Sequence, residues 1–534
     1  MEAPSIEELI ARRCCRPRLR RWLAPLAVGA AILHGGCSRP LQWARNGFKV
    51  GPNYCKPLAP VAPEWIYADD PRVASAPPRD GDWWNVFQDP TLNGLVCRAY
   101  RQNLNLRSIG TRVLQARAQQ AIAVGNVLPQ NQQVLGLYPS GVLGKAPNHI
   151  DVTAFNLSWE LDFWGKYRRQ IETANARLDA SVESYDDALV TLLADVATNY
   201  VQYRVAQQQI KIAEANLQTQ EKLVALAEQQ EKVGTANIVD VEQLRTLMEQ
   251  TRSSIPAFRI TQGQANDRLC ILMGEPPRDL EAVLGGAPQS GTAPLPTMPI
   301  EVDAGVPSDL LLRRPDVRNA ERLVAAQSPQ IGVAKADLLP SLSIGTTLGY
   351  GDIDLGPALA TSGGLAFITP QFSWKILNYG RLLNNIRLQD ARTQELVASY
   401  QNKVLTAAQE VQTALRGFLR SQEQAEALAS SAAAALEATD VQEKLFTDVK
   451  ADVNRLFTLE NSKLQQQQNL AVAQGNIALN LINVYRALGG GWDLRLHPEA
   501  CDLPAAEQSH ETVPAEAVPE GDVEEDSPVA TEPE

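Results

Sequence analysis

The sequence predicts a mainly α-helical fold built from a duplicated unit, in which each copy has a helix, a pair of β-strands and two very long helices. Three observations predict it: an internal repeat at a fixed offset, an apolar seam with the coiled-coil period, and short segments in which apolar and polar residues alternate. With 534 residues, 44% of them apolar, the chain is long enough to bury a large core.

The repeat is the most informative feature. Two stretches match at an offset of 215 and a third at 211, so each half of the chain carries the same elements in the same order. The matched pairs are 157–166 with 372–381, 234–238 with 449–453, and, at the offset of 211, 107–129 with 318–340.

The long helices follow from an apolar seam that starts at Tyr185 and continues to Ala227 in alternating steps of four and three residues. The seam predicts one helix over 168–231, roughly 95 Å long at 1.5 Å per residue. Gly234 ends this helix, and a partner helix runs over 238–273, where Pro256 must end or kink it. The second copy predicts helices over 382–449 and 452–488. A free-standing coiled-coil spacer is the alternative for such helices alone.

Segments in which apolar and polar residues alternate predict the strands. Residues 134–138 face 153–163 in the first copy, and 342–350 face 368–376 in the second, with loops expected at 140–150 and 351–364. A soluble sheet packed on one side would show the same alternation as a membrane barrel. Four strands cannot close a barrel, so strands that enter lipid would have to be pooled by several chains.

Composition excludes several classes of protein. The net charge of −12 arises after residue 498, where 12 acidic residues stand without a basic one, which leaves 49 acidic and 49 basic residues in the body. A neutral body gives no reason to expect nucleic acid as a partner. The four histidines are scattered and the sequence has no H-E-x-x-H or C-x-x-C spacing, so we expect no metal site, no cofactor and no catalytic centre.

The amino terminus has the parts of an export signal over 1–36: a run of arginines, an apolar stretch and two small residues before Cys37. This order predicts lipoprotein processing with acylation of Cys37, and an ordinary signal with an incidental cysteine is the alternative. The mature chain has no apolar run of 18 residues, so no membrane-spanning helix is expected. Its further cysteines, Cys55, Cys97, Cys270 and Cys501, are too dispersed for a disulfide scaffold.

Five motifs, in order, carry a resemblance to a known family over about residues 50–493. The chain resembles the TolC-type outer-membrane efflux channels, and more closely their lipoprotein branch that serves resistance-nodulation-division pumps. The motifs are Val50-Gly-Pro-Asn-Tyr54-x-x-Pro57, Trp83-Trp-x-x-Phe87-x-Asp89-Pro90, Leu311-x-x-Arg314-Pro-Asp-Val317, the duplicated Trp-to-Gly motif (Trp159 to Gly165 and Trp374 to Gly380), and Tyr485-Arg-Ala-Leu-Gly-Gly-Gly-Trp492.

The resemblance implies a homotrimer in which each chain gives four strands to one twelve-stranded barrel in the outer membrane, while the helices form a periplasmic tunnel. It implies a passive conduit for drugs, metals or other small solutes, not an enzyme. Its partners would be a periplasmic adaptor (membrane fusion) protein and an inner-membrane resistance-nodulation-division transporter. The expected division is a signal (1–36), an extended segment (37–91), the first repeat (92–275), a belt linker (276–303), the second repeat (304–493) and a disordered acidic tail (494–534).

In the family the tunnel closes at the turns between the long helices. The corresponding candidates for the gate and for adaptor contact are Gly234, Asp240, Val449, Asp452, Asn454, Arg455 and Thr458. We hypothesise that Asp240, Asp452 or Arg455 supplies gate contacts through salt bridges, and solvated helix ends are the alternative. For the whole chain, the alternatives are a periplasmic coiled-coil adaptor or scaffold, and an exit duct for type I protein secretion.

Overall fold

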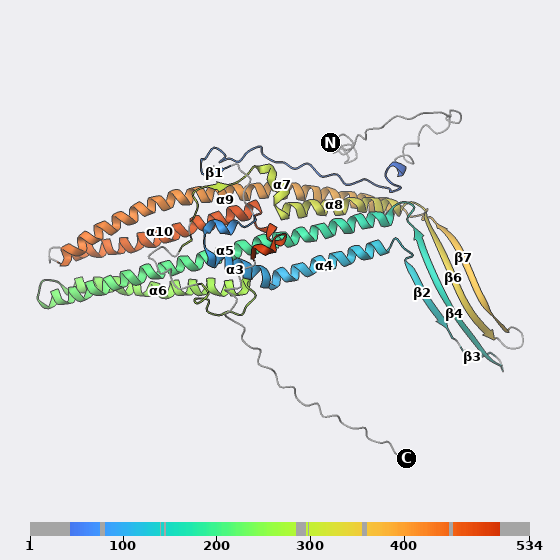
Figure 1. Ribbon diagram of the computed structural model, residues 1–534, viewed down its shortest axis with the longest axis horizontal. Helices are drawn as coiled ribbons and strands as arrows, with labels where there is room; N and C mark the ends of the chain where they lie inside the picture. The colour runs from blue at the N-terminus through green and yellow to red at the C-terminus, as the bar shows by residue number, and fades with distance from the viewer. Residues whose placement is uncertain are drawn as a thin grey trace, which may run out of the picture.

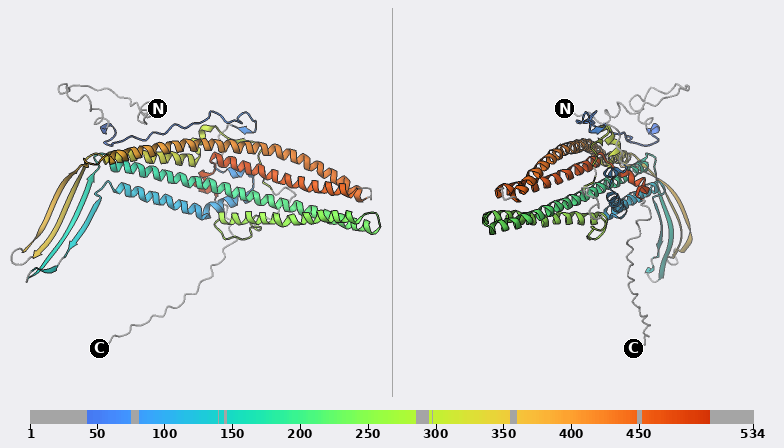
Figure 2. Two further views of the ribbon diagram at one scale, coloured as in Figure 1. Left: turned by 180° about the vertical axis from the view of Figure 1, so that it is seen from behind. Right: turned by 60° about the vertical axis from the view of Figure 1, so that its left-hand side comes forward.

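The computed structural model describes residues 43–74, 81–138, 140–143, 146–284, 295–296, 298–354, 360–447 and 452–501. The molecule is elongated, with long parallel and antiparallel helices forming a body and a β-sheet leaving one end at an angle (Figures 1 and 2). The expected signal, Cys37, Val449 and the acidic tail beyond Cys501 lie outside the described residues.

The duplication is confirmed element by element. Two helices of 22 residues, α4 (Leu104–Gly125) and α8 (Pro315–Ala336), correspond at the offset of 211. Two helices of 67 residues, α5 (Lys166–Lys232) and α9 (Arg381–Thr447), correspond at 215. Their partners are α6 (Ile238–Leu272) and α10 (Val453–Leu488). At 1.5 Å per residue, α5 and α9 are each about 100 Å long.

The shorter helices lie end to end beside the long ones (Figure 1). Helices α4 and α6 follow one another along α5, while α8 and α10 follow one another between α5 and α9. Equivalent hydrogen bonds close the two joints: Asn103 Nδ2 donates to the Leu272 carbonyl and Arg314 Nη1 to the Ala487 carbonyl, both at 2.8 Å. The six helices α4, α5, α6, α8, α9 and α10 form a layer that we call the wall. The wall is continuous at both joints although no short helix spans its full length.

The sheet is antiparallel and joins the two repeats through its central pair. Its order is β2 (Asn131–Leu137), β4 (Ala146–Leu161), β6 (Ser341–Asp354) and β7 (Ala360–Ser373), with β3 (Ser140–Leu143) continuing beside β4 after β2. The expected long loops at 140–150 and 351–364 are wrong. The ladder extends through the described residues of both segments, as in the pair Ser140 with His149, because hairpin partners satisfy backbone groups whatever the polarity of the side chains.

The expectation that the helix could end at Pro256 is also wrong. Helix α6 runs through Pro256 to Leu272. The proline is exposed, so water can bond the carbonyl that lacks its usual helical donor, and the helix on either side is held by packing along α5.

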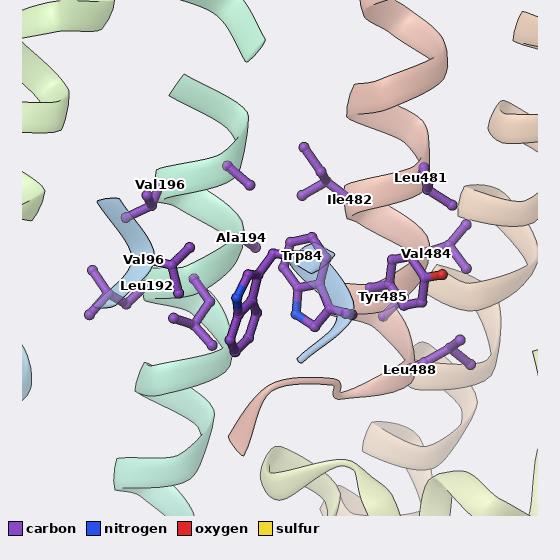
Figure 3. Close-up of a cluster of buried hydrophobic side chains, with 14 of the residues drawn as sticks. Trp84, Val96, Leu192, Ala194, Val196, Leu481, Ile482, Val484, Tyr485 and Leu488 are labelled. Atoms are coloured by element: carbon purple, nitrogen blue, oxygen red, sulfur yellow. The ribbon is translucent and has the colours of Figure 1, made fainter. Parts of the chain in front are cut away.

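The main apolar core lies at mid-length, where short segments from both chain ends pack onto α5 and α10. The 3-10 helix η1 (Trp83–Phe87) places Trp84 between these two helices (Figure 3), and the Trp83 ring stacks on Tyr485 with centroids 5.4 Å apart. Helix α3 (Pro90–Gln102) follows η1, and β1 (Val73–Ala74) pairs in parallel with β5 (Val302–Asp303).

The segment after α10 is ordered, which corrects the expectation of a disordered tail from residue 494. It forms η3 (Trp492–Arg495) and η4 (Pro498–Cys501), and a disulfide joins Cys501 to Cys97 of α3. Leu494 and Cys501 are both buried, so apolar contact and a covalent link fix the segment 492–501. The linear spacing of the cysteines concealed this pair because 404 residues separate its members.

Candidate functional site

The first hairpin turn, between α5 and α6, lies at the end of the body opposite the sheet (Figure 1); Gly234 is in this turn, and Asp240 is the third residue of α6. Gly234 has a φ of +81°, a left-handed conformation that glycine adopts without strain, and its N–H donates to the Glu231 carbonyl at 2.9 Å. The Asp240 carboxylate accepts from the Asn237 N–H at 3.0 Å in a capping box. Both predicted gate residues thus make local contacts that end one helix and begin the next.

The remaining described gate candidates lie just after the second turn, at the N-cap and in the first six residues of α10 (Val453–Leu488). Asp452 caps α10, because its Oδ1 accepts from the Asn454 N–H at 3.0 Å, and Thr458 Oγ1 donates to the Asn454 carbonyl at 2.8 Å. Arg455 is exposed on the first turn of α10. The salt-bridge hypothesis for Asp240, Asp452 and Arg455 stays a prediction, since the ion pairs that it requires would join different copies of the chain.

The two hairpins touch just behind these turns through a second, smaller apolar cluster, which we call the tip cluster. It comprises Leu223, Val224, Ala227, Val241, Leu244, Phe446, Val453 and Leu456. Gln230 Nε2 also donates to the Phe446 carbonyl at 3.2 Å, from the first hairpin to the second. The tip of each chain therefore packs as a four-helix unit.

The first hairpin carries a ladder of ion pairs along its exposed face. Three arginines of α6 reach three glutamates of α5 at intervals of seven residues: Arg245 with Glu228 (2.8 Å), Arg252 with Glu221 (3.1 Å) and Arg259 with Glu214 (3.0 Å). Exposed pairs of this kind each contribute little to stability, but their spacing favours one antiparallel register.

Between the described residues of α9 and α10 no such ladder forms. At the offset of 215, Glu228 and Arg245 correspond to Glu443 and Glu460, so two acids meet where the first repeat has an acid and a base. Lys463 supplies the cation: its Nζ lies 2.9 Å from Glu460 Oε2 and 3.2 Å from Glu443 Oε1. Our sequence reading assigned no role to these three residues, although comparing the repeats at this offset could have identified them.

At the other end of the body, the duplicated Trp-to-Gly motif joins the sheet to the long helices. Trp159 Nε1 donates to the Val127 carbonyl at 3.0 Å, and Trp374 Nε1 to the Leu338 carbonyl at 3.1 Å. Gly165 and Gly380 both have a φ of +78° and precede α5 and α9. The motif therefore makes the same strand-to-helix junction twice.

The amino-terminal segment docks on the first of these junctions. Trp43 packs against Phe163 and Trp164, with ring centroids 5.0 and 5.6 Å apart. The guanidinium of Arg169 donates to the carbonyls of Val50 and Gly51, both at 3.1 Å. This segment is therefore fixed at the end of the body next to the sheet.

The described residues contain no group of three or more His, Cys, Asp or Glu side chains that could hold a metal ion. Among the helices described, none is both long enough and apolar enough to cross a bilayer.

The geometry agrees with comparisons to known proteins. The model of the outer membrane efflux protein family matches residues 95–275 and 306–490, which are the two repeats. The chain belongs to this family. Membership confirms the predicted fold class of a helical tunnel wall with membrane strands, the role as an outer-membrane efflux component, and the location at the outer membrane.

Individual relatives are similar over most of their length. The toluene efflux pump outer membrane protein TtgC of Pseudomonas putida is 30% identical over 503 residues, covering 89% of this chain and 96% of TtgC. The cation efflux system protein CusC of Escherichia coli O6:H1 is 28% identical over 456 residues, covering 84% and 97%. Among solved structures, the outer-membrane channel OprN superimposes with a TM-score of 0.75 at 28% identity, covering 83% of this chain and 99% of OprN.

Proposed function

We propose that three copies of this chain assemble into the outer-membrane channel of a tripartite efflux pump, a passive conduit with no catalytic step of its own. The form of the sheet carries this proposal. β2 and β7 end the hydrogen-bonded order and each has an unpaired edge within the chain. An unpaired edge in lipid costs several kcal/mol per backbone group, and pairing β7 of one copy with β2 of the next would remove every edge.

Exposed apolar side chains support both the membrane barrel and the helical tunnel of the proposed assembly. Val134, Ile368 and Phe372 share one face of the sheet and are more than half exposed, as lipid-facing residues of a barrel would be. Leu114 and Ile122 on α4, and Leu383 and Leu405 on α9, are also at least half exposed on the two outermost helices of the wall. Contact between α9 of one copy and α4 of the next would cover them and close a tunnel.

The tip is the proposed docking site for the periplasmic adaptor, with the inner-membrane transporter of the resistance-nodulation-division class beyond it. Val233, Ile238 and Val239 are exposed apolar residues around the first turn, where a partner would bury them. The cargo is left open, since the names of the relatives TtgC and CusC specify chemically different cargo, toluene and cations.

Gate contacts between copies are proposed for Asp240, Asp452 and Arg455. Replacing Asp452 and Arg455 with alanine should raise the conductance of the closed channel in planar bilayers, because ion pairs across the aperture would be lost. An Arg252→Ala variant, which loses an exposed pair away from the turns, serves as the control. Closure unchanged from that control would reject the gate assignment.

Acylation of Cys37 is proposed to anchor the chain in the membrane. Only five residues separate Cys37 from Trp43, which packs at the sheet end of the body, so a lipid attached to Cys37 would lie near the strands. An aromatic cluster at this level suits the membrane interface.

The assembly is tested by fractionating the cell envelope and measuring the mass of detergent-extracted protein without boiling. A heat-sensitive outer-membrane species of about three chain masses, each 58.3 kDa less its signal, is expected. A soluble periplasmic monomer or dimer would reject the trimeric barrel and favour the scaffold alternative.

A further inference from the structure

The charged residues between α9 and α10 near the tip form a buried and unbalanced group. Glu460 is fully buried and the side chain of Lys463 is 6% exposed, while that of Glu443 is 27% exposed. Two ionised carboxylates and one ammonium would leave a net negative charge here. Such a charge in a site that excludes water is costly, and two adjacent carboxyl groups avoid it by sharing a proton.

Among the described residues, Lys463 is the cation in contact with the fully buried Glu460, whereas two further lysines line the groove beside the more exposed Glu443. The groups that face this site are Asp440 and Lys444 of α9 and Lys222 of α5, which line the neighbouring groove with Glu443. On α6, Arg245 is engaged on the exposed face of the first hairpin by Glu228 and Glu242. Glu460 therefore depends on Lys463 and on a proton shared with Glu443.

We propose that Glu443, Glu460 and Lys463 form a proton-dependent latch, which keeps α9 and α10 packed at the tip while one carboxyl group is protonated and loosens them when that proton leaves. The latch lies next to the tip cluster: Leu456, four residues before Glu460, and Phe446, three residues after Glu443, are both buried in it. Loss of the proton would thus act on the contact between the two hairpins. Its effect on conduction rests on the proposed function, whereas the latch itself does not.

The stability of the packed tip should depend on pH because Glu460 binds its proton more tightly in the packed state than in the open state. Burial, assisted by the hydrogen bond with Glu443, raises the pKa of Glu460 to about 7 from an ordinary value of 4.5, although Lys463 opposes the rise. A raised carboxyl pKa stabilises the packed state below 4.5, and this stabilisation is lost progressively as the pH rises to about 7. Opening at neutral pH releases a proton, so acid favours the closed tip and mild alkali the open one.

Hydrogen exchange of the full-length assembled protein in detergent, measured at pH 6 and pH 8, tests the latch directly. For peptides covering 440–465, the opening constant should rise about tenfold in the wild type after correction for intrinsic exchange, as expected for a pKa that moves from about 7 to 4.5 on opening. Glu460→Gln, which resembles the protonated acid, should remove this rise. Glu443→Gln should do the same, because a single acid paired with Lys463 needs no proton.

The matched control is Glu228→Gln, which changes the corresponding residue of the first hairpin and should keep the tenfold rise. If both Glu460→Gln and Glu443→Gln show the wild-type dependence, or the wild type shows none, the latch is rejected. Conductance at the same two pH values separates the two proposals. If the channel conducts equally at both pH values, the latch does not control conduction. If no variant conducts, the proposed channel function is contradicted, and the hydrogen-exchange result alone decides whether the latch exists.

Discussion

Gly165 and Gly380 occupy equivalent places in the two repeats but have different surroundings. Both have a φ of +78°. A Cβ at Gly165 would lie 2.8 Å from the Lys49 Cα and 2.6 Å from its Cγ, whereas a Cβ at Gly380 would meet nothing nearer than the Asn384 side chain at 3.8 Å. Backbone conformation requires glycine at both positions, and close approach of the amino-terminal segment requires it again at Gly165.

Gly165→Ala should therefore be more destabilising than Gly380→Ala. Each substitution costs about 1–2 kcal/mol for the left-handed backbone, and the clash with Lys49 should add roughly 1–3 kcal/mol at Gly165 alone. Thermal unfolding of the two variants measures the difference, and proteolysis should cleave the segment around Lys49 faster only in Gly165→Ala. Equal unfolding temperatures would show that the segment moves aside without cost.

Glu172 should make the docking of the amino-terminal segment sensitive to acid. Burial alone would raise the pKa of Glu172, but hydrogen bonds from Lys49 and Arg169 outweigh it and lower the pKa below the usual 4.5. A lowered pKa stabilises docking above about pH 4.5, and this contribution is lost as the pH falls through the lower, folded-state value. Proteolysis of the segment should accelerate over that acid range in the wild type. In Glu172→Gln the rate should be high and nearly independent of pH, and an acid step that persisted would contradict this assignment.

At the scale of single elements, the sequence predicted the long helices well. The expected ranges of 168–231 and 382–449 fall within two residues of α5 and α9, because an uninterrupted helical pattern marks both helices and Gly234 marks the end of α5. The strand ends were predicted less well, since hairpin pairing extends through polar residues that resemble loops in sequence. Pro256 was misjudged because packing against α5 holds the helix on both sides of it.

Pro256→Ala should stabilise the first hairpin. The exposed proline interrupts the helical hydrogen bonds of α6, and alanine would restore a donor to the Arg252 carbonyl at a gain of roughly 1–3 kcal/mol. Pro256→Glu should also place an acid three residues before Arg259, the spacing of the pairs Glu242 with Arg245 and Glu249 with Arg252. A higher unfolding temperature for both variants is expected. A fall would show that the fold requires a bend at this point.

At the scale of the whole molecule, the disulfide between Cys97 and Cys501 holds together segments from opposite ends of the chain. Reduction, Cys97→Ser and Cys501→Ser should each destabilise the mid-length core by about 2–5 kcal/mol, because the link restricts a loop of about 400 residues in the unfolded chain. Thermal unfolding with and without reductant measures this. The double variant should match either single variant and ignore reductant, and a further loss in the double variant would mean that the thiols stabilise the core without the bond.

Duplication made the order of elements predictable, and the family motifs made the architecture predictable, because both are recorded in local residue patterns. The contacts that close the molecule were not predictable in this way. Cys97 with Cys501, and Asp186 with Arg495, pair residues that lie hundreds of positions apart without any periodic pattern. The described gate candidates lie at or next to the turns, but their role in a gate stays a prediction, because their partners would belong to other copies of the chain, which a single sequence does not specify.

The end-to-end joints of the short helices have a consequence for how such a wall can change in length. Only α5 and α9, among the described helices, run past both joints, while α6 and α10 occupy the tip half and α4 and α8 the sheet half. Deleting one heptad from each arm of both hairpins would shorten the tip half by about 10 Å and leave the sheet half and both joints unchanged. Reach into the periplasm and insertion into the membrane are thus separable dimensions, which evolution or engineering could adjust independently.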